Sequence, residues 1–530
     1  MIATRTRTMK ARILDLCRAA LRLGWLLVWL FAGSLAQAQP TDEPQFEVTG
    51  YEIEGDLPIP RERAQAILAP YTGGAVTLSQ LKDAAKALET ALSESGYPFY
   101  RVILPAQTAE RVIKLRVLTF RLGSVSVQGN RNFSKENVLR SLPALRPGEG
   151  TNVSELARNR AAVNDHPSKS VEVNFVQGDK LDVVDAEVTV QDERPIRVFL
   201  GLNNFGNRQT GKYRATIGLQ HANLWDRDHS MTATFTTSPD HIDDVKQYGL
   251  YYRMPFYTVG GALTLFYVYS DVNSGVVANA FEVSGRGTFA GIHWRQYLVP
   301  IGAYSHAVEM GIDDRLFEND VVFGGVQLGV DVRTRPLLLG YHARLDRVAW
   351  NIGGGLQYVR NIAGGGDSGP EAYEANRAGA TRDWGAVRAS LDGQWRVQPI
   401  TFVARVRGQY SDDNLIAGEQ FGIGGAYSVR GLREREVTGD SGVFGSVEAV
   451  LPLPWNGWSV AAFIDAGHVS LNGAIPGQPG HQDAFSFGVG LRWAIARRLA
   501  ASVDAAQVLD GTTVTNRSMR RIHASVMYWL

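Results

Sequence analysis

The stretch RIHASVMYWL, residues 521–530, ends the chain with two alternating faces. Its even-numbered residues, from Ile522 to Leu530, are apolar, whereas Arg521, His523 and Ser525 are polar. Because successive side chains of a strand point to opposite sides of the sheet, one face suits lipid and the other suits water. The pattern predicts a strand of a membrane β-barrel.

Fifteen further runs alternate in the same way between turn-rich segments. Eleven precede a long segment at about 411–442, and four lie between that segment and the last strand. Sixteen strands is an even number, as a closed antiparallel barrel requires, since an open edge in lipid would leave backbone groups unpaired. The fifteen runs are 197–203, 213–222, 230–236, 248–254, 262–269, 288–298, 306–314, 337–345, 348–358, 384–395, 401–410, 443–450, 459–465, 484–493 and 499–506.

The part of the chain before the barrel repeats itself once, and both copies read strand, helix, helix, strand, strand. In the first copy, Thr77–Gln80 has the Thr-x-x-Gln pattern of a capping box, and the helix it begins should end at Gly96. In the second copy, helices are predicted at 135–142 and 153–163. Two small α+β modules are therefore expected ahead of the barrel.

The first 38 residues have the features of a secretory signal peptide. A basic segment precedes the apolar run from Leu23 to Leu35, and Ala36–Ala38 is a small-x-small cleavage site. We expect cleavage after Ala38. Cys17 is the only cysteine of the chain and would leave with this segment.

The mature composition argues against several function classes. Without residues 1–38 the chain has 48 basic and 52 acidic groups, a net charge of −4, which gives no electrostatic case for nucleic acid. The ten histidines show no His-x-x-x-His spacing, and no Gly-x-Ser-x-Gly elbow occurs. We expect no catalytic residue, no cofactor and no metal, although a barrel enzyme with a spatially assembled site is not excluded by these patterns.

Two short signatures lie near the C-terminus: Val429, Arg430 and Gly431 in the long segment, and the run from Phe463 to Gly467 around Asp465. They resemble the VRGY loop motif and the FxDxG strand motif of the Omp85 superfamily. Within it, the likeness is greatest to the two-partner secretion outer-membrane transporters (ShlB/FhaC/HecB-like, TpsB).

That resemblance implies a domain plan and a function. Residues 46–120 and 121–194 would be periplasmic POTRA domains, and 195–530 a barrel in a Gram-negative outer membrane. The POTRA domains would bind one secreted exoprotein, which would leave through the pore. The further expected partners are membrane lipid and, during biogenesis, the barrel assembly machinery and periplasmic chaperones, with the transporter acting as a monomer.

The strand order predicts how the signatures meet. With periplasmic modules, the loop after the eleventh strand starts outside, and its glycine-rich, charge-poor sequence favours folding back into the pore. Alternation places Asp465 on the lumenal face of its strand. Arg suits a bidentate contact with a carboxylate, so we expect Arg430 to pair with Asp465 as a latch, with Val429, Gly431, Phe463 and Gly467 in support. The resemblance implies the same pair.

Two departures from the family pattern give further expectations. Leu432 stands where the loop motif has an aromatic residue, and the charged run 433–436 after it is expected to be solvated. The segment 39–45 is too short to thread a barrel as a plug helix, which would leave the inward loop as the main constriction.

Two other functions fit parts of the pattern. One is an assembly or insertion factor of the same superfamily, and the other is a passive porin or receptor. The sequence names neither the client, which could be a haemolysin, an adhesin or a contact-dependent toxin, nor the way in which the pore opens.

Overall fold

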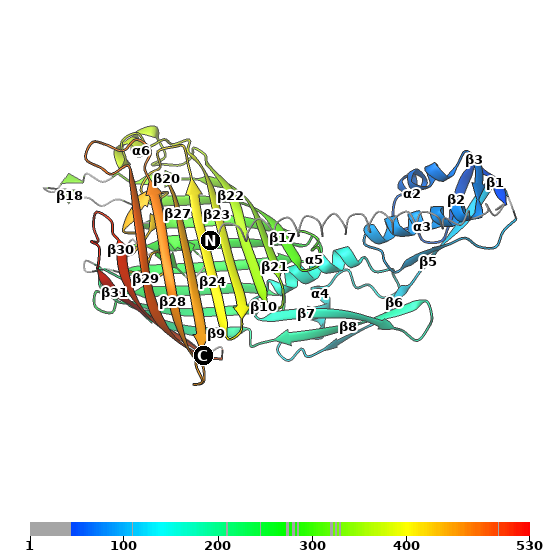
Figure 1. Ribbon diagram of the computed structural model, residues 1–530, viewed down its shortest axis with the longest axis horizontal. Coiled ribbons are helices and arrows are strands. Elements are labelled where there is room, and N and C mark those ends of the chain that lie inside the picture. Colours follow the sequence, from blue (N-terminus) through cyan, green and yellow to red (C-terminus); the bar gives the residue numbers. More distant parts are fainter. Residues whose placement is uncertain are drawn as a thin grey trace, which may run out of the picture. The chain divides into compact units, whose positions relative to one another are not determined.

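The computed structural model describes residues 44–530 except 109, 208–209, 244, 272–274, 278–280, 284–285, 319–321, 324–325, 328–329 and 497. The expected signal peptide and its cleavage site lie outside the described residues. So does the segment 39–45, which we expect to be too short for a plug helix, apart from its last two positions. The chain divides into two compact units, one reaching to Leu88 together with Val102–Val117, the other comprising Glu89–Arg101 and Leu118–Leu530 (Figure 1).

The first module contains the predicted strand, helix, helix, strand and strand, but its first strand is divided in two and an additional short strand lies between the helices. Strands β1 (Gln45–Val48) and β3 (Gly74–Thr77) pair, and β2 (Gly50–Glu54), β5 (Val112–Thr119) and β4 (Tyr100–Ile103) form a second sheet. Its helices are α2 (Arg61–Leu68), η2 (Ala69–Tyr71) and α3 (Leu78–Glu94).

The predicted capping box at the start of α3 is confirmed. The backbone N–H of Thr77 donates to Gln80 Oε1 at 2.9 Å, and the N–H of Gln80 donates to Thr77 Oγ1 at 3.2 Å. Two backbone donors at the start of the helix, which would otherwise be unpaired, are thereby satisfied.

The second module comprises β6 (Arg121–Gln128), α4 (Lys135–Arg140), α5 (Val153–Asn164), β7 (Lys169–Gln177) and β8 (Val183–Asp192). Ser134 and Asn152 cap its two helices by accepting hydrogen bonds from Asn137 and Glu155. The strand order is β6-β8-β7, so β7 lies at an edge of the sheet.

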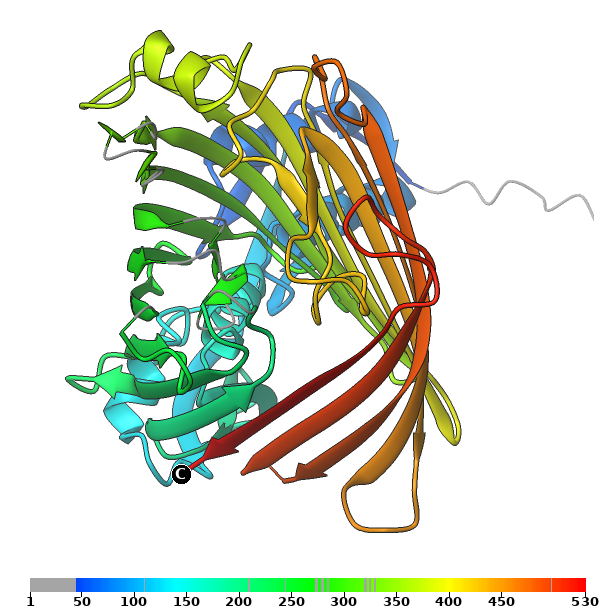
Figure 2. The same cartoon turned by 90° about the vertical axis from the view of Figure 1, so that its left-hand side faces the viewer.

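A closed antiparallel barrel of sixteen strands follows, as predicted (Figures 1 and 2). The last strand pairs with the first and closes it, while the short β20 (Val332–Thr334) lies just ahead of β21 on the same neighbour. The strands are β9 (Ile196–Asn203), β10 (Arg214–Leu224), β11 (His229–Thr237), β12 (Lys246–Phe256), β13 (Gly261–Ser270), β16 (Gly287–Tyr297), β17 (Tyr304–Phe317), β21 (Pro336–Asp346), β22 (Trp350–Asn361), β23 (Gly385–Val397), β24 (Ile400–Tyr410), β27 (Ser441–Pro452), β28 (Trp458–Ser470), β29 (His481–Ile495), β30 (Leu499–Asp510) and β31 (Arg520–Trp529).

Shorter elements lie in the connections. Outside the barrel sheet, β14 (Gly275–Val277) pairs with β15 (Phe281–Val283), and β18 (Val322–Phe323) pairs with β19 (Val326–Gln327). Helix α6 (Pro370–Asn376) lies between β22 and β23. We call the end of the barrel where β9 begins the proximal end, and the opposite end the distal end.

Burial confirms the predicted alternation. In β28, Ile464 is 51% exposed whereas Phe463 and Asp465 are 3% and 0% exposed. Apolar side chains thus face outward and polar ones line the interior, as a barrel in lipid requires. Among the described helices, none combines the length and the apolar character needed to span a bilayer.

A buried polar cluster joins the second module to proximal turns of the barrel. Lys169 Nζ lies 2.6 Å from Asp228 Oδ2 and 2.6 Å from Asn137 Oδ1, and the hydroxyl of Tyr257 donates to Asp228 at 2.7 Å. The side chains of Lys169 and Asp228 are 0% and 1% exposed. Because a buried charge is costly without a partner, these contacts tie the module to the barrel.

Candidate functional site: the loop inside the barrel

The segment between β24 and β27 folds back into the barrel as a hairpin (Figure 2). Two three-residue strands, β25 (Phe421–Ile423) and β26 (Val437–Gly439), pair with each other. Buried side chains between and on these strands pack against lumenal side chains of β27 to β30. This cluster contains Ile423, Val429, Leu432 and Val437 from the loop, and Phe444, Val469, Ala484 and Val508 from the barrel wall.

Arg430 lies at the tip of the hairpin and contacts Asp465 of β28. Its Nε is 2.7 Å from Oδ2 and its Nη2 is 2.8 Å from Oδ1, and the backbone N–H of Arg430 also donates to Oδ2 at 3.1 Å. Arg430 is 6% exposed and Asp465 is fully buried. The contact is a bidentate charge-assisted pair, the geometry that suits guanidinium and carboxylate.

Two further carboxylates surround the same guanidinium. Nη1 of Arg430 lies 2.9 Å from Glu448 of β27 and 3.6 Å from Asp504 of β30. Arg492 of β29 bridges these carboxylates at 3.1 Å and 2.6 Å. Two arginines thus face three carboxylates, and the excess negative charge favours a cation at the loop tip.

The neighbouring signature residues shape this contact. The guanidinium of Arg430 lies over the ring of Phe463, 3.3 Å from its centroid, a cation–π arrangement. A Cβ added at Gly467 would come within 2.9 Å of Ile423 and 3.0 Å of Val429. The glycine therefore allows the loop to approach β28 closely.

Gly431 joins the tip to the last strand. Its N–H donates to Nε2 of His523 at 3.0 Å, and its carbonyl accepts from Nε of Arg521 at 3.1 Å. Its φ of +99° is a conformation that favours glycine, and a Cβ there would lie 2.8 Å from Val508. The tip is therefore bound to β27, β28 and β31 at once.

The arm of the loop that leads from β24 to β25 is held by a second buried carboxylate. The side chain of Glu419 is fully buried and accepts from Arg315 of β17 at 2.8 Å, Arg388 of β23 at 3.0 Å and Thr334 of β20 at 2.8 Å. This arm is thereby attached to the wall opposite the tip contacts.

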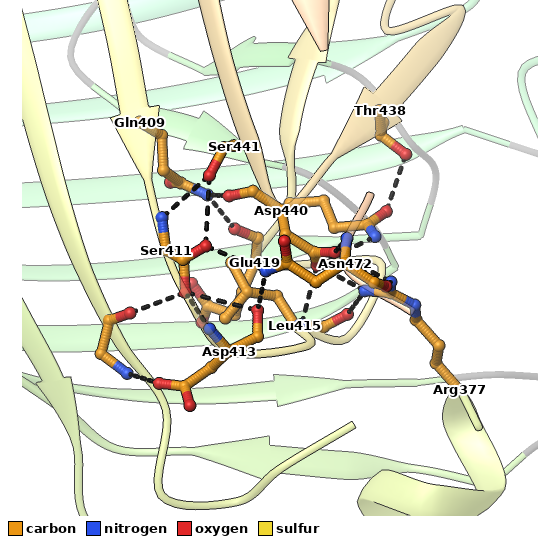
Figure 3. Close-up of polar contacts among 12 residues, drawn as sticks. Arg377, Gln409, Ser411, Asp413, Leu415, Glu419, Thr438, Asp440, Ser441 and Asn472 are labelled. Atoms are coloured by element: carbon orange, nitrogen blue, oxygen red, sulfur yellow. Dashed lines mark hydrogen bonds and ion pairs between the residues drawn. The ribbon is translucent and has the colours of Figure 1, made fainter. Parts of the chain in front are cut away.

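A third buried carboxylate, Asp440, holds the loop at its root (Figure 3). It pairs with Arg377, which follows helix α6, and accepts from the backbone N–H groups of Leu415 and Asn472, each at 2.8 Å. The root of the loop therefore contacts two distal connections, one that precedes the loop in sequence and one that follows it. In the described part of the chain no group of histidine, cysteine or carboxylate side chains could hold a metal ion.

The charged run 433–436 differs from the expectation of a solvated stretch. Arg433 is exposed, but the next three residues are partly buried. Glu436 accepts hydrogen bonds from Thr512 at 2.5 Å and Thr515 at 2.6 Å, both in the connection between β30 and β31. The reason is that the loop folds inside the barrel, where this run meets the wall instead of bulk water.

The sequence reasoning named Arg430 and Asp465 but missed most of their surroundings. Glu448 and Asp504 lie on strands whose polar and apolar residues alternate, so the sequence pattern could have placed both side chains on the lumenal face. Glu419 and Asp440 gave no such signal, because their partners lie far away in sequence.

A sequence model described as haemolysin secretion/activation protein ShlB/FhaC/HecB matches residues 184–493, and one described as POTRA domain, ShlB-type, matches residues 46–119. The heme/hemopexin transporter protein HuxB of Haemophilus influenzae (strain 86-028NP) is 25% identical over 191 residues, 35% of this chain and 34% of that protein. The chain thus aligns with about a third of the length of this relative. The outer membrane transporter CdiB of Escherichia coli is 22% identical over 87% of this chain and 77% of its own.

The fold is similar to two solved structures. CdiB from Escherichia coli matches with a TM-score of 0.69 at 16% identity, covering 94% of this chain and 93% of that one. CdiB from Acinetobacter baumannii matches with a TM-score of 0.67 at 16% identity, covering 97% and 98%.

Proposed function

The chain belongs to the family of haemolysin secretion/activation proteins (ShlB/FhaC/HecB), and we propose from this membership that it exports one cognate exoprotein. It is an outer-membrane β-barrel protein of a transporter family whose POTRA domains are periplasmic. The client would enter from the periplasm and leave through the barrel.

The loop inside the barrel is the observation that carries this proposal. A hairpin held by three buried carboxylates, Asp465, Glu419 and Asp440, occupies the pore. A passive porin has no need of such an obstruction, whereas an exporter needs a pore that stays closed until a client arrives. We assign Arg430 and Asp465 as the latch, with Val429, Gly431, Phe463 and Gly467 as its supports.

The POTRA modules supply a docking edge. We take 46–120 and 121–194 as the two modules, 195–530 as the barrel, 411–442 as its inward loop and cleavage after Ala38. The edge strand β7 of the second module can accept an extended client as an additional strand, because main-chain hydrogen bonds bind a strand largely independently of its sequence.

Gene deletion tests the proposal. A strain without this chain should no longer release one particular polypeptide, while its other outer-membrane proteins stay at normal levels in mass spectrometry of membranes and medium. Re-expression of the wild-type chain is the control. A general loss of outer-membrane proteins would contradict export of a single client and favour an assembly factor.

A further inference from the structure

Two cavities flank the loop inside the barrel. One, of about 780 Å³, lies between the loop and strands β9 to β13, and the other, of about 700 Å³, lies between the loop and a wall that includes β22 to β24. Tyr427, Glu434 and Arg435 of the loop line both. The loop thus divides the lumen into two spaces with different walls.

The barrel wall of the larger cavity is polar and largely uncharged, whereas the loop side of this cavity carries Arg433, Glu434, Arg435 and Glu436. No acidic side chain of β9 to β13 lines it, and its arginines lie toward its ends, Arg197 and Arg253 at the proximal end and Arg214 at the distal end. Between them the barrel side is covered by hydroxyl and amide groups. These are Thr216, Gln220, Thr232, Thr236, Gln247 and Thr264.

Although uncharged, these groups can form hydrogen bonds with a polypeptide in the cavity. A hydroxyl both donates and accepts, and an amide carries both functions, so the wall can pair with either backbone group of a passing chain. Thr216 and Thr236 share one hydrogen bond at 2.8 Å, and Gln220 donates one to Thr232 at 3.2 Å. Each of these hydroxyl and amide groups has further donor or acceptor positions, so the wall can form more hydrogen bonds.

The smaller cavity has a charged wall. Arg315, Arg388, Arg405 and Arg407 line it together with the carboxylates of Asp392 and Glu419. Fixed charges hold segments of opposite charge and repel segments of like charge. A client with varied sequence would therefore be retained or rejected segment by segment on this side.

We propose that the exported polypeptide crosses the barrel as an extended chain through the cavity beside β9 to β13, a path we call the neutral track. This inference rests on the proposed function and specifies its route. Every residue of an extended chain presents backbone donors and acceptors that need partners once water is excluded. A wall of weak, uncharged partners satisfies them at many positions without holding any one segment, as transport requires.

The neutral track is continuous with the second module. Pro167 lines the same cavity, and the edge strand β7 begins two residues later at Lys169. The side chain of Asn164 pairs with the backbone N–H and C=O of Val171 at the start of this edge, so a client would pair with the later part of β7 and reach the proximal mouth of the track from there. The smaller cavity has no lining residue from this module.

Disulfide capture of defined peptides by the full-length chain tests the route. Single cysteines at Thr232→Cys on the neutral track and Ser390→Cys in the smaller cavity each replace a small hydroxyl residue, and the mature chain has no other cysteine. The probes are an uncharged peptide of Ser, Thr, Asn and Gly and the same peptide with Glu at alternate positions, each with an activated terminal cysteine.

We expect the uncharged peptide to react about fivefold faster with Thr232→Cys than with Ser390→Cys, the ratio that a net hydrogen-bond contribution of about 1 kcal/mol gives. The acidic peptide should reverse this preference. Equal rates at the two sites, or faster capture of the uncharged peptide at Ser390→Cys, would overturn the neutral track.

A second measurement uses the released polypeptide identified by gene deletion. A bulky maleimide on Thr232→Cys should stop its release, whereas the same reagent on Ser390→Cys should leave most of it; the opposite result would overturn the route. If no released polypeptide depends on the chain, the proposed function fails, and the peptide capture still reports the property of the lumen by itself.

Discussion

A single arginine organises the tip of the loop. The guanidinium of Arg430 reaches Asp465 through two nitrogens and Glu448 through a third. A lysine could not reproduce this pattern, because its ammonium is a point charge without the planar fork. The residue type, and not only its charge, therefore fixes the position of the loop.

Neutralising Asp465 should loosen the tip. Removing one partner of a buried ion pair costs about 3 kcal/mol or more, which corresponds to roughly a 100-fold rise in the open population. A reporter cysteine at Val429, which is fully buried, should then be labelled by a maleimide about 100-fold faster in Asp465→Asn. Asp392→Asn is the control, since its pair with Arg407 is half exposed. Unchanged labelling in Asp465→Asn would contradict the latch.

Gly431→Ala should have a smaller effect of the same sign. The positive φ and the approach to Val508 at 2.8 Å make any side chain unfavourable, and such strain costs about 1–3 kcal/mol. Labelling of the cysteine at Val429 should rise about tenfold. Gly445→Ala on β27 is the matched control because a Cβ there meets nothing within 4 Å. Equal labelling rates in the two variants would show that a glycine at position 431 is not needed to hold the loop tip in place.

At the scale of elements, the junction between the second module and the barrel should respond to pH. Burial lowers the pKa of His166 to about 4, against 6.5 for an exposed imidazole, because the loss of water around the ring disfavours its charged form. Its Nε2 donates to the carbonyl of Ala222 at 2.6 Å, and its Nδ1 accepts from Ser168 at 3.2 Å. A second proton would place a donor against the N–H of Ser168.

The sign of the pH effect follows from this lowered pKa. The docked state binds fewer protons than the undocked state, so docking is fully stable above pH 6.5 and weakens as the pH falls towards 4, by at most about 3 kcal/mol. The protection factors for amide hydrogen exchange in α4 and α5, which correct for the intrinsic pH dependence of exchange, should fall over this range. Replacement His166→Gln should flatten the profile, and a profile that remained equally steep would assign the effect to another group.

The sequence predicted the elements better than their partners. Period-two alternation identified all sixteen strands and the face of Asp465, because each strand has one side in lipid. It did not predict the β25–β26 hairpin, whose strands are too short to show a period, nor the pairing of Glu419 with Arg315. Such contacts depend on how the barrel closes and on its stagger, which local pattern does not contain.

At the scale of the whole barrel, the closing seam is short. β31 and β9 pair over five residues, from Ser525 opposite Asn203 to Trp529 opposite Phe199, whereas β9 and β10 pair over eight. The side chain of Asn204 extends the seam by bonding the backbone of Ile522 and Ala524 at 2.9 Å and 2.8 Å.

The loop tip contacts both sides of this seam. The ring of Phe205, just after β9, lies 5.5 Å from Tyr427 of the loop and 6.1 Å from His523 of β31, between ring centroids. His523 in turn accepts from Gly431. Withdrawal of the loop therefore removes contacts that support the seam. A client could then cross either inside the lumen or between the separated strands β31 and β9.

A disulfide across the seam separates these routes. Asn203 and Ser525 lie directly opposite each other, and opposed antiparallel residues have Cα atoms about 4.5–5.5 Å apart, within the range that a disulfide spans. With the client inside the lumen, the oxidised double variant Asn203→Cys/Ser525→Cys should release as much client as its reduced form. Each single cysteine serves as the control for substitution alone. Release that returned only on addition of reductant would show that the strands must part, because the disulfide leaves the lumen open but holds the seam closed.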